Sequence, residues 1–192
     1  MTAVDQRGMT RFFGEFEPPE GLKVELLRGE IVMMAAPDLV HNRIVSNVQD
    51  QIPFRRWERL QTTDVDIVDE ASEPVPDLVV LEHGVAPDNG RLLPSQVITL
   101  AVEVVSKTSV DRDYGVKRSI YAAGKIPAYL IIDPIVAHCV LLTEPVGVGD
   151  MADYRAQRIT KFGDPLPLEL LGIELDTSRF QTLTGVRRHH LP

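Results

Sequence analysis

Residues 97–133 read VITLAVEVVSKTSVDRDYGVKRSIYAAGKIPAYLIID, and this stretch decides the fold. It opens with an apolar run that is broken only by Thr99 and Glu103, as expected for a central strand covered on both faces. Gly124 is placed to end the helix that follows. Residues 128–133 then return as a strand. The order strand, helix, strand predicts a right-handed crossover with parallel pairing.

Two side chains in this stretch do not fit a plain core. Glu103 lies among β-branched residues, where a carboxylate is costly to bury without a partner. Lys117 occupies a core position in the inward stripe of the following helix, at spacings of four, three and four: Val110, Tyr114, Lys117 and Tyr121. The ordinary explanation is a lysine whose stem packs while its head reaches water. Nearby carboxylates would instead give Lys117 buried partners.

A second strand end carries another acid, Asp77, in EPVPDLVVLEHG at residues 73–84. Pro76 cannot donate to a sheet ladder, so it belongs at the first residue of this strand. Two carboxylates at neighbouring strand ends can share a divalent cation, and an ammonium beside them can orient or deprotonate an attacking water. We expect the carboxylates of Asp77 and Glu103 to lie about 4 to 6 Å apart. We also expect at least one of them to have a raised pKa, unless Lys117 compensates.

These residues resemble the PD-(D/E)xK nuclease superfamily, whose members place the Asp and the Glu on adjacent strands around Mg²⁺. Pro76-Asp77 and Glu103 match that pattern. Val105 departs from it, because the superfamily has a lysine at this position. Lys117 is the candidate substitute, since a lysine on the following helix can reach the same point from a different backbone position.

Within the superfamily, the chain is similar to the Uma-two family of restriction-endonuclease-like proteins over roughly residues 20–180. The family pattern is EVxS, an Asp and a Lys four apart, a Tyr four further on, and a Pro-x-Tyr strand ending in Asp-Pro. The matching residues are Glu103 to Ser106, Asp113, Lys117, Tyr121, Pro127, Tyr129 and Asp133-Pro134. Upstream, VELLRGEIVMMAAPDLVHNRIV at 24–45 is similar to the family's opening hairpin and helix.

The resemblance implies an α/β fold, or α+β by stricter definitions, with a restriction-endonuclease-like mixed sheet flanked by helices. It implies Mg²⁺, or Mn²⁺ as a substitute, held by Asp77 and Glu103, with Lys117 as a catalytic residue. Glu30 matches the acid that the opening element brings towards the metal, although an ordinary turn acid would look the same. His41 matches a family histidine, in a position that is more often structural than catalytic. The implied partner is nucleic acid, in particular DNA, and cutting both strands of a duplex implies a homodimer.

The rest of the chain is expected to form a loose N-terminal arm, 1–17, and a single domain, 18–192. Asp111 and Asp113 sit where they complement the dipole of the following helix. His189 and His190 end a tail that we expect to be flexible. The other expected elements are a hairpin of 22–27 with 31–34 around Gly29, a helix from the N-cap Asp38 to Ile52, a strand at 62–68, a loop at 82–94, a hairpin of 138–143 with 154–162, and an edge or covering flap at 166–175.

Composition adds bounds on this interpretation. The length of 192 residues and the 44% hydrophobic content suit one globular domain. A lone cysteine, Cys139, excludes an internal disulfide and, without a charged-then-apolar leader, favours the cytoplasm. No apolar run approaches the roughly 20 residues that cross a bilayer. The net charge of −8 is unusual for a nucleic-acid binder, although basic residues cluster at 55–59 and 187–188.

Two other classes of function stay open. One is a binding or assembly protein on a nuclease-like fold, in which the acids and Lys117 form an inert ion-pair network; Val105 and the acidic composition favour it. The other is a metal-dependent hydrolase of a different phosphoester. Neither G-x-x-x-x-G-K-[ST] nor G-x-G-x-x-G occurs, so the sequence contains no glycine motif for a nucleotide phosphate.

Overall fold

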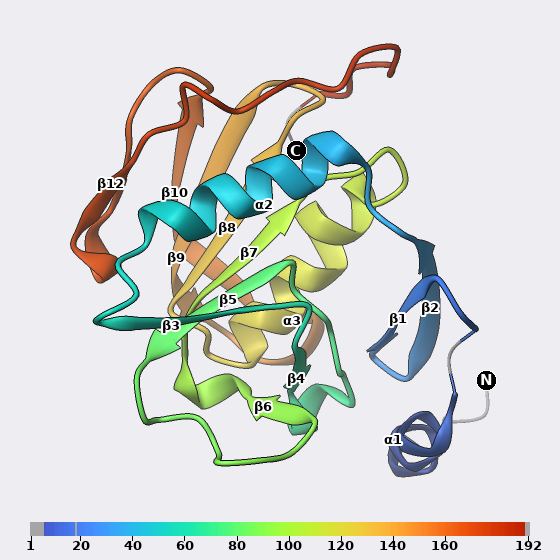
Figure 1. The fold of residues 1–192 in the computed structure, drawn as a ribbon. Coiled ribbons are helices and arrows are strands. Elements are labelled where there is room, and N and C mark those ends of the chain that lie inside the picture. Colours follow the sequence, from blue (N-terminus) through green and yellow to red (C-terminus); the bar gives the residue numbers. More distant parts are fainter. Residues whose placement is uncertain (1–5, 18, 191–192) are drawn as a thin grey trace.

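The fold centres on a six-stranded sheet in the order β10-β9-β8-β7-β5-β3 (Figure 1). The computed structural model describes residues 6–17 and 19–190. Within them the strands of this sheet are β3 Trp57–Gln61, β5 Leu78–Glu82, β7 Ile98–Val104, β8 Ala128–Asp133, β9 His138–Val146 and β10 Asp153–Lys161. Only β7 and β8 pair in parallel, and all other neighbours in the sheet are antiparallel. The sheet is therefore mixed, with its parallel pair near the centre.

The strand–helix–strand unit predicted from 97–133 is present. β7 leads through α3, Lys117–Ala123, into β8, and the two strands pair in parallel with Glu103 opposite Ile131. The helix ends at Gly124, as the sequence indicates. A π-helical turn over Arg112–Val116 precedes α3 and was not expected from the spacing. Such wide turns are frequent at functional sites.

Both faces of the sheet are covered, so alternate residues of each central strand enter different cores. On one face Val80, Val102 and Leu130 pack with Ile44, Val45 and Val48 of α2, Leu39–Gln51. On the other face Val79, Ala101 and Ile131 pack with Ile120 and Tyr121 of α3. Figure 1 shows the two helices on opposite sides of the strands. Glu103 has the same parity as Ala101, so its side chain faces α3.

The predicted N-terminal hairpin is confirmed as β1, Leu22–Leu27, and β2, Glu30–Ala35. Arg28 and Gly29 turn the chain with φ values of 50° and 78°, which suits a glycine at the second position. The hairpin lies beside the sheet rather than in it (Figure 1). β1 is joined to the segment before β5 by reciprocal backbone hydrogen bonds between Leu26 and Glu73.

Several expected elements differ in the structure. The strand expected at 62–68 is only β4, Asp64–Asp66, and the longer strand β3 was missed. The expected loop at 82–94 contains β6, Leu92–Pro94, which pairs in parallel with β4. The segment interpreted as a loose arm contains α1, Gln6–Glu15. None of the helices in the described part of the chain is long and apolar enough to span a membrane.

The C-terminal region closes over one side of the sheet. β11, Leu166–Leu168, and β12, Ile173–Leu175, form the small covering flap that the sequence indicates. The following segment returns to the end of β8, where Leu183 N–H donates to Pro134 O at 2.9 Å. His189 Nε2 lies 2.8 Å from Asp133 Oδ2, a contact that the sequence does not indicate.

The N-cap of α2 provides a test of the local structure. Asp38 Oδ1 accepts a hydrogen bond from His41 N–H at 3.0 Å, as a capping aspartate does. We expect Asp38→Ala to lower the free energy of unfolding by about 1 kcal/mol, because one helical N–H loses its partner. Asp38→Asn should retain most of the stability, and Asp88→Ala in an exposed loop should change little. Urea denaturation measures all three, and equal stability of Asp38→Ala and wild type would contradict the cap.

Candidate functional site

Polar side chains from four regions converge on a cavity of about 670 Å³ at one end of the central strands. The cavity lies between the β1–β2 hairpin, the start of α2, the beginning of β5 and the end of β7 with the turn that follows. Its titratable lining residues include Lys23, His41, Asp77, Glu103, Asp113 and Lys117. The two strand-end acids and the lysine predicted from the sequence therefore face one space.

Asp77 is fixed directly before β5 by three donors. Its Oδ2 accepts from Val104 N–H at 2.8 Å, which ties it to the last residue of β7. Lys23 Nζ lies 3.1 Å from Oδ1, and His41 Nε2 lies 2.9 Å from Oδ2. Burial alone would raise the pKa of Asp77, but the Lys23 ammonium and His41 outweigh burial and hold that pKa well below its usual range. Asp77 is therefore ionised at neutral pH.

Glu103 and Lys117 form a buried ion pair. Lys117 Nζ donates to Glu103 Oε1 at 2.7 Å, and Tyr121 Oη donates to the same oxygen at 2.7 Å. Lys117 is only 2% exposed. Val105, which stands at the superfamily's lysine position, is fully buried in the α3-side core. Lys117 thus reaches Glu103 from the helix while an apolar residue fills the strand position.

Glu25 on β1 is a buried member of the cluster that the sequence interpretation missed. Its Oε1 accepts from Lys117 Nζ at 2.8 Å and from Val75 N–H at 2.8 Å. Its Oε2 is buried and has no hydrogen-bond partner among the described residues. A signal was present, because Glu25 interrupts an apolar strand as Glu103 does. The residue escaped notice because β1 is short and begins with exposed and half-buried positions.

Glu30 does not occupy the place expected for the opening element's acid. It is exposed at the start of β2 and is not among the residues that line the cavity. Glu25, on the paired strand, contacts Lys117 instead. The expectation for Glu30 is therefore corrected: the hairpin does supply an acid, but from β1.

Asp113 also faces the cavity, although its position in the sequence suggested a helix-dipole role. It is buried in the π-helical turn, and Ser109 Oγ donates to its Oδ2. Burial raises the pKa of Asp113 to about 6, against the opposing effect of Lys117. Helical spacing places Lys117 inward, as the sequence predicts, but it does not predict that Asp113, within the π-helical turn, also faces the site.

The cluster has more acid than base. Glu25, Asp77, Glu103 and Asp113 face two ammonium groups, those of Lys23 and Lys117, an excess of two negative charges if every acid is ionised. Burial raises the pKa of Glu103 to about 8, and the neighbouring Asp77 charge adds to this effect although Lys117 opposes it. The expectation that one of the paired acids has a raised pKa is confirmed.

The donor set fits a hard divalent cation, although a complete ligand group is not assembled. Carboxylates are the ligands that Mg²⁺ and Mn²⁺ prefer, and the unpartnered Glu25 Oε2 and the excess negative charge suit such an ion. Among residues 6–17 and 19–190, however, no three His, Cys, Asp or Glu side chains are arranged to hold a metal. Lys23 and His41 already contact both oxygens of Asp77. Metal binding would require these contacts to rearrange.

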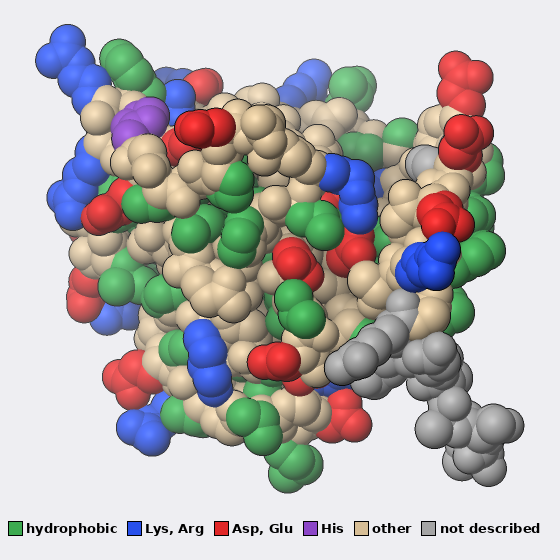
Figure 2. All heavy atoms as spheres, turned by 90° about the horizontal axis from the view of Figure 1, so that it is seen from below, with side chains coloured by type: hydrophobic (Ala, Val, Ile, Leu, Met, Phe, Trp, Pro, Cys, Tyr) green, Lys and Arg blue, Asp and Glu red, His purple; other side chains and the backbone are tan. Residues whose placement is uncertain are grey.

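The face seen in Figure 2 shows no gathering of basic side chains among the described residues. On the side seen in Figure 2, Lys and Arg side chains lie scattered among acidic and apolar ones. Arg59, from the basic cluster at 55–59, donates to Gln49 O and Ile52 O at the end of α2 and so has a structural role. Near the cavity, Lys107 is an exposed lining residue. An exposed basic side chain is thus present at the cavity itself, in Lys107, rather than in a broad basic face around it.

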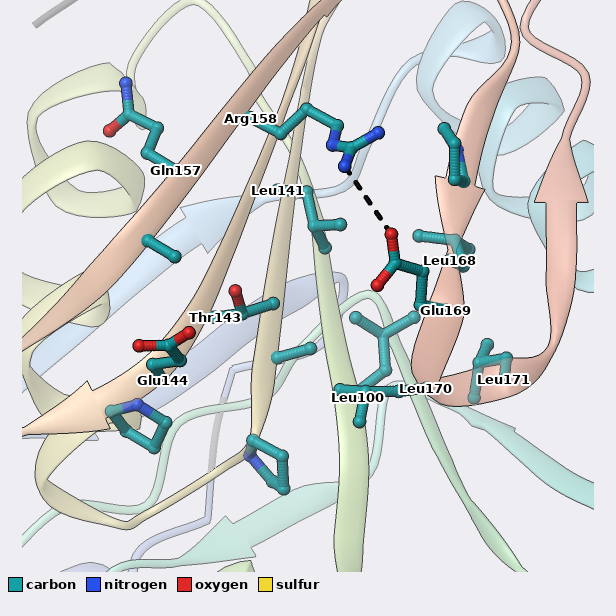
Figure 3. A pocket seen from close by; sticks show the side chains of 15 residues that line it. Leu100, Leu141, Thr143, Glu144, Gln157, Arg158, Leu168, Glu169, Leu170 and Leu171 are labelled. Carbon is teal, nitrogen blue, oxygen red and sulfur yellow. Dashed lines mark ion pairs between the residues drawn. The ribbon is translucent and has the colours of Figure 1, made fainter.

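A second hollow of about 570 Å³ lies near the start of β7 and β8, beneath the flap (Figure 3). Its wall is largely apolar, with Leu100, Leu141 and Leu171 among the lining residues. Arg158 and Glu169 form an ion pair across it at 3.5 Å. No buried acid or lysine lines this hollow, so the reactive groups gather in the first cavity.

Comparison with known proteins identifies the family and the fold. The profile of the Uma2 family, described as "Putative restriction endonuclease", matches residues 12–178. No curated protein matches the chain. Among solved structures it is similar to "a putative nuclease belonging to DUF820" from Anabaena variabilis, with a TM-score of 0.64 and 15% identity, over 89% of this chain and 96% of that one. The fold is restriction-endonuclease-like, and the predicted α/β class is confirmed.

The raised pKa of Glu103 predicts an unusual pH dependence of stability. Unfolding returns the pKa of Glu103 from about 8 to its ordinary value of 4.5. Between these two pH values the folded state therefore holds one proton more than the unfolded state. The free energy of unfolding should therefore fall as pH rises through this window, by about 1 kcal/mol per pH unit. Asp113, whose pKa rises from 3.8 to about 6 on folding, adds the same trend between these pH values. The lowered pKa of Asp77 affects stability only below the ordinary pKa of an aspartate.

Urea denaturation between pH 5 and 8.5 tests this on the apo protein, in a range set by these pKa values. Glu103→Gln, which mimics the protonated acid, should flatten the curve. The exposed Glu144→Gln should leave the slope as in wild type. A wild-type curve that rises steadily from pH 5 to 8 would contradict the assignment.

Proposed function

We propose, from the premise that this chain belongs to the Uma2 family, that it is a divalent-metal-dependent endonuclease acting on nucleic-acid phosphodiesters. The observation that carries the proposal is the buried cluster of Asp77, Glu103 and Glu25 around Lys117. Asp77 and Glu103 lie at adjacent strand ends and, with Lys117, line an open cavity, while Glu25 contacts Lys117 from the hairpin. Acids and a lysine in this relation suit hydrolysis of a phosphodiester.

Asp77 and Glu103 are the proposed metal ligands, with Glu25 in support because its Oε2 has no partner in the described chain. Mg²⁺, or Mn²⁺ in its place, would supply Lewis-acid polarisation of the scissile phosphate. Val104 N–H holds Asp77 against the end of β7, so both carboxylates are placed by the sheet itself. The backbone contact holds Asp77 in place when the side chains around it move, whereas the Glu103 carboxylate is held by Lys117 and Tyr121.

Lys117 is the proposed catalytic lysine. Two of its three N–H donors go to Glu25 and Glu103 in the recorded contacts. The remaining donor is available to a water or to a phosphoryl oxygen that carries developing charge. Carboxylates on two sides raise the pKa of Lys117 despite its burial, so it acts as a cation rather than as a base. This favours positioning of water and charge stabilisation over proton abstraction.

DNA is the proposed substrate, and the active form is proposed to be a homodimer because cleavage of both strands needs two sites. The edge of the cavity carries side chains that could bind a phosphate backbone. Ser106, Lys107 and Thr108 follow β7 and line the cavity. Hydroxyl and ammonium donors of this kind contact phosphate oxygens without reading sequence. The proposal therefore involves little base recognition by this loop.

The contacts at Asp77 favour one alternative. Lys23 and Lys117 pair with the acids in the structure as it stands, and no three-residue metal group is assembled among the described residues. A binding or assembly protein on a nuclease-like fold would keep such a network for its own folding. In that case removal of Lys117 would leave buried charge uncompensated, at a cost of about 3–5 kcal/mol.

Lys117→Met and Glu103→Gln separate the two functions, with the exposed Lys161→Met as control. We expect Lys117→Met to lower plasmid nicking by about a hundredfold or more, since transition-state stabilisation is lost, while Mn²⁺ binding survives. Glu103→Gln should weaken both nicking and Mn²⁺ affinity. Lys161→Met should behave as wild type. Nicking, calorimetry with Mn²⁺ and melting temperature are measured on the same four proteins.

The alternative predicts a different pattern. Wild-type protein would neither bind Mn²⁺ nor nick DNA, and Lys117→Met would only melt at a lower temperature. That result would overturn the nuclease proposal.

A further inference from the structure

Lys23 stands where a cation would be held. Its Nζ lies 3.1 Å from Asp77 Oδ1 and 3.8 Å from Glu25 Oε1, and so lies between acids of two different elements. We propose that Lys23 is an internal counter-ion that fills this position, and that the divalent ion of the proposed site binds Asp77 and Glu103, with Glu25 in support, only after the Lys23 side chain swings out. This inference rests on the proposed function of the site and concerns its regulation.

The two lysines of the cluster differ in how firmly they are held. Lys117 is almost fully buried and makes two short contacts, at 2.7 and 2.8 Å, to different acids. The Lys23 side chain is 20% exposed and makes one close and one longer contact. It also lines the cavity, on the strand at its edge. Lys23 is therefore the ammonium that can leave, whereas Lys117 is fixed.

Departure of Lys23 would leave a site suited to a metal. Asp77 Oδ1 would lose its ammonium partner, and so would Glu25, whose Oε1 lies 3.8 Å from Lys23 Nζ and whose Oε2 is already unpartnered among the described residues. The local charge would become more negative by one unit, which attracts a divalent ion. The backbone contact from Val104 N–H would keep Asp77 in place meanwhile. The exchange thus replaces one cation by another with little movement of the backbone.

The released Lys23 ammonium could bind a phosphate of the substrate. Lys23 borders the same opening as Ser106, Lys107 and Thr108, where the phosphate backbone is proposed to lie. A phosphate there would stabilise the outward position of Lys23, because a flexible lysine binds phosphate as a point charge. Substrate and metal would then each favour the binding of the other. The apo protein would stay weakly loaded with metal until nucleic acid arrives.

Mn²⁺ calorimetry on the full chain tests the exchange with three variants: Lys23→Met, Lys23→Arg and the exposed control Lys161→Met. Lys23→Met should bind Mn²⁺ about tenfold or more tightly than wild type. The Lys23 charge opposes cation binding at Asp77 just as it opposes protonation, and an opposite charge at such a distance lowers a carboxylate pKa by about one to three units. Lys23→Arg keeps the charge and should resemble wild type. Melting temperature confirms folding, and Mn²⁺ should raise that of Lys23→Met more than that of wild type.

A second arm adds a short duplex DNA with a non-hydrolysable phosphate analogue. The duplex should tighten Mn²⁺ binding to wild type about tenfold and should change the affinity of Lys23→Met much less, because no internal cation remains to be displaced. Equal Mn²⁺ affinities of wild type and Lys23→Met would overturn the exchange, even if wild type nicks DNA. Absence of Mn²⁺ binding and of nicking in every protein would overturn the proposed function as well.

Discussion

The contact on which the site depends is the Lys117 ammonium between Glu25 and Glu103. Each of these carboxylates would be costly to bury alone, and a single cation that serves both makes their burial possible. This one contact also joins three separate parts of the chain: the N-terminal hairpin, the central strand β7 and helix α3. The hairpin is not part of the main sheet. Glu25 helps to hold it beside the strands, together with the Arg28–Glu70 ion pair and the backbone bonds between Leu26 and Glu73.

The alternation of side chains along β7 makes this contact possible. Residues alternate between the two covered faces of β7, and Glu103 falls on the same side as Ala101, towards α3. The crossover from β7 to β8 passes over that side and carries Lys117 with it. A shift of one residue in either element would separate the two charges. The register of the parallel pair, in which Glu103 lies opposite Ile131, therefore determines the chemistry of the cavity as well as its packing.

The sequence predicts the elements with strong and long patterns, and fails where a short element depends on distant partners. The apolar run of β7, the N-cap of α2 and the glycine turn of the first hairpin carry their own local signals. β3 is short and largely polar, and its pairing with β5 makes it a strand, whereas the strand predicted at 62–68 is present only as the short β4. In the site, Asp77 and Glu103 stand out as acids in apolar runs. Glu25 has the same signal on a half-exposed strand, and Asp113 becomes inward only through a π-helical turn that spacing does not reveal.

Stability alone is a poor reason for this arrangement. Buried ion pairs can often be replaced by apolar residues without loss of stability, and Val105 shows that this face of β7 accepts an apolar side chain in place of a lysine. A purely structural network would also be expected to match its acids with lysines, whereas four buried acids here face two lysines and the raised pKa of Glu103 keeps one of these acids protonated at neutral pH. An excess of acid with one unpartnered oxygen stores an unfavourable energy that a divalent cation would relieve. The retained imbalance therefore favours a site that binds an external cation over an inert network.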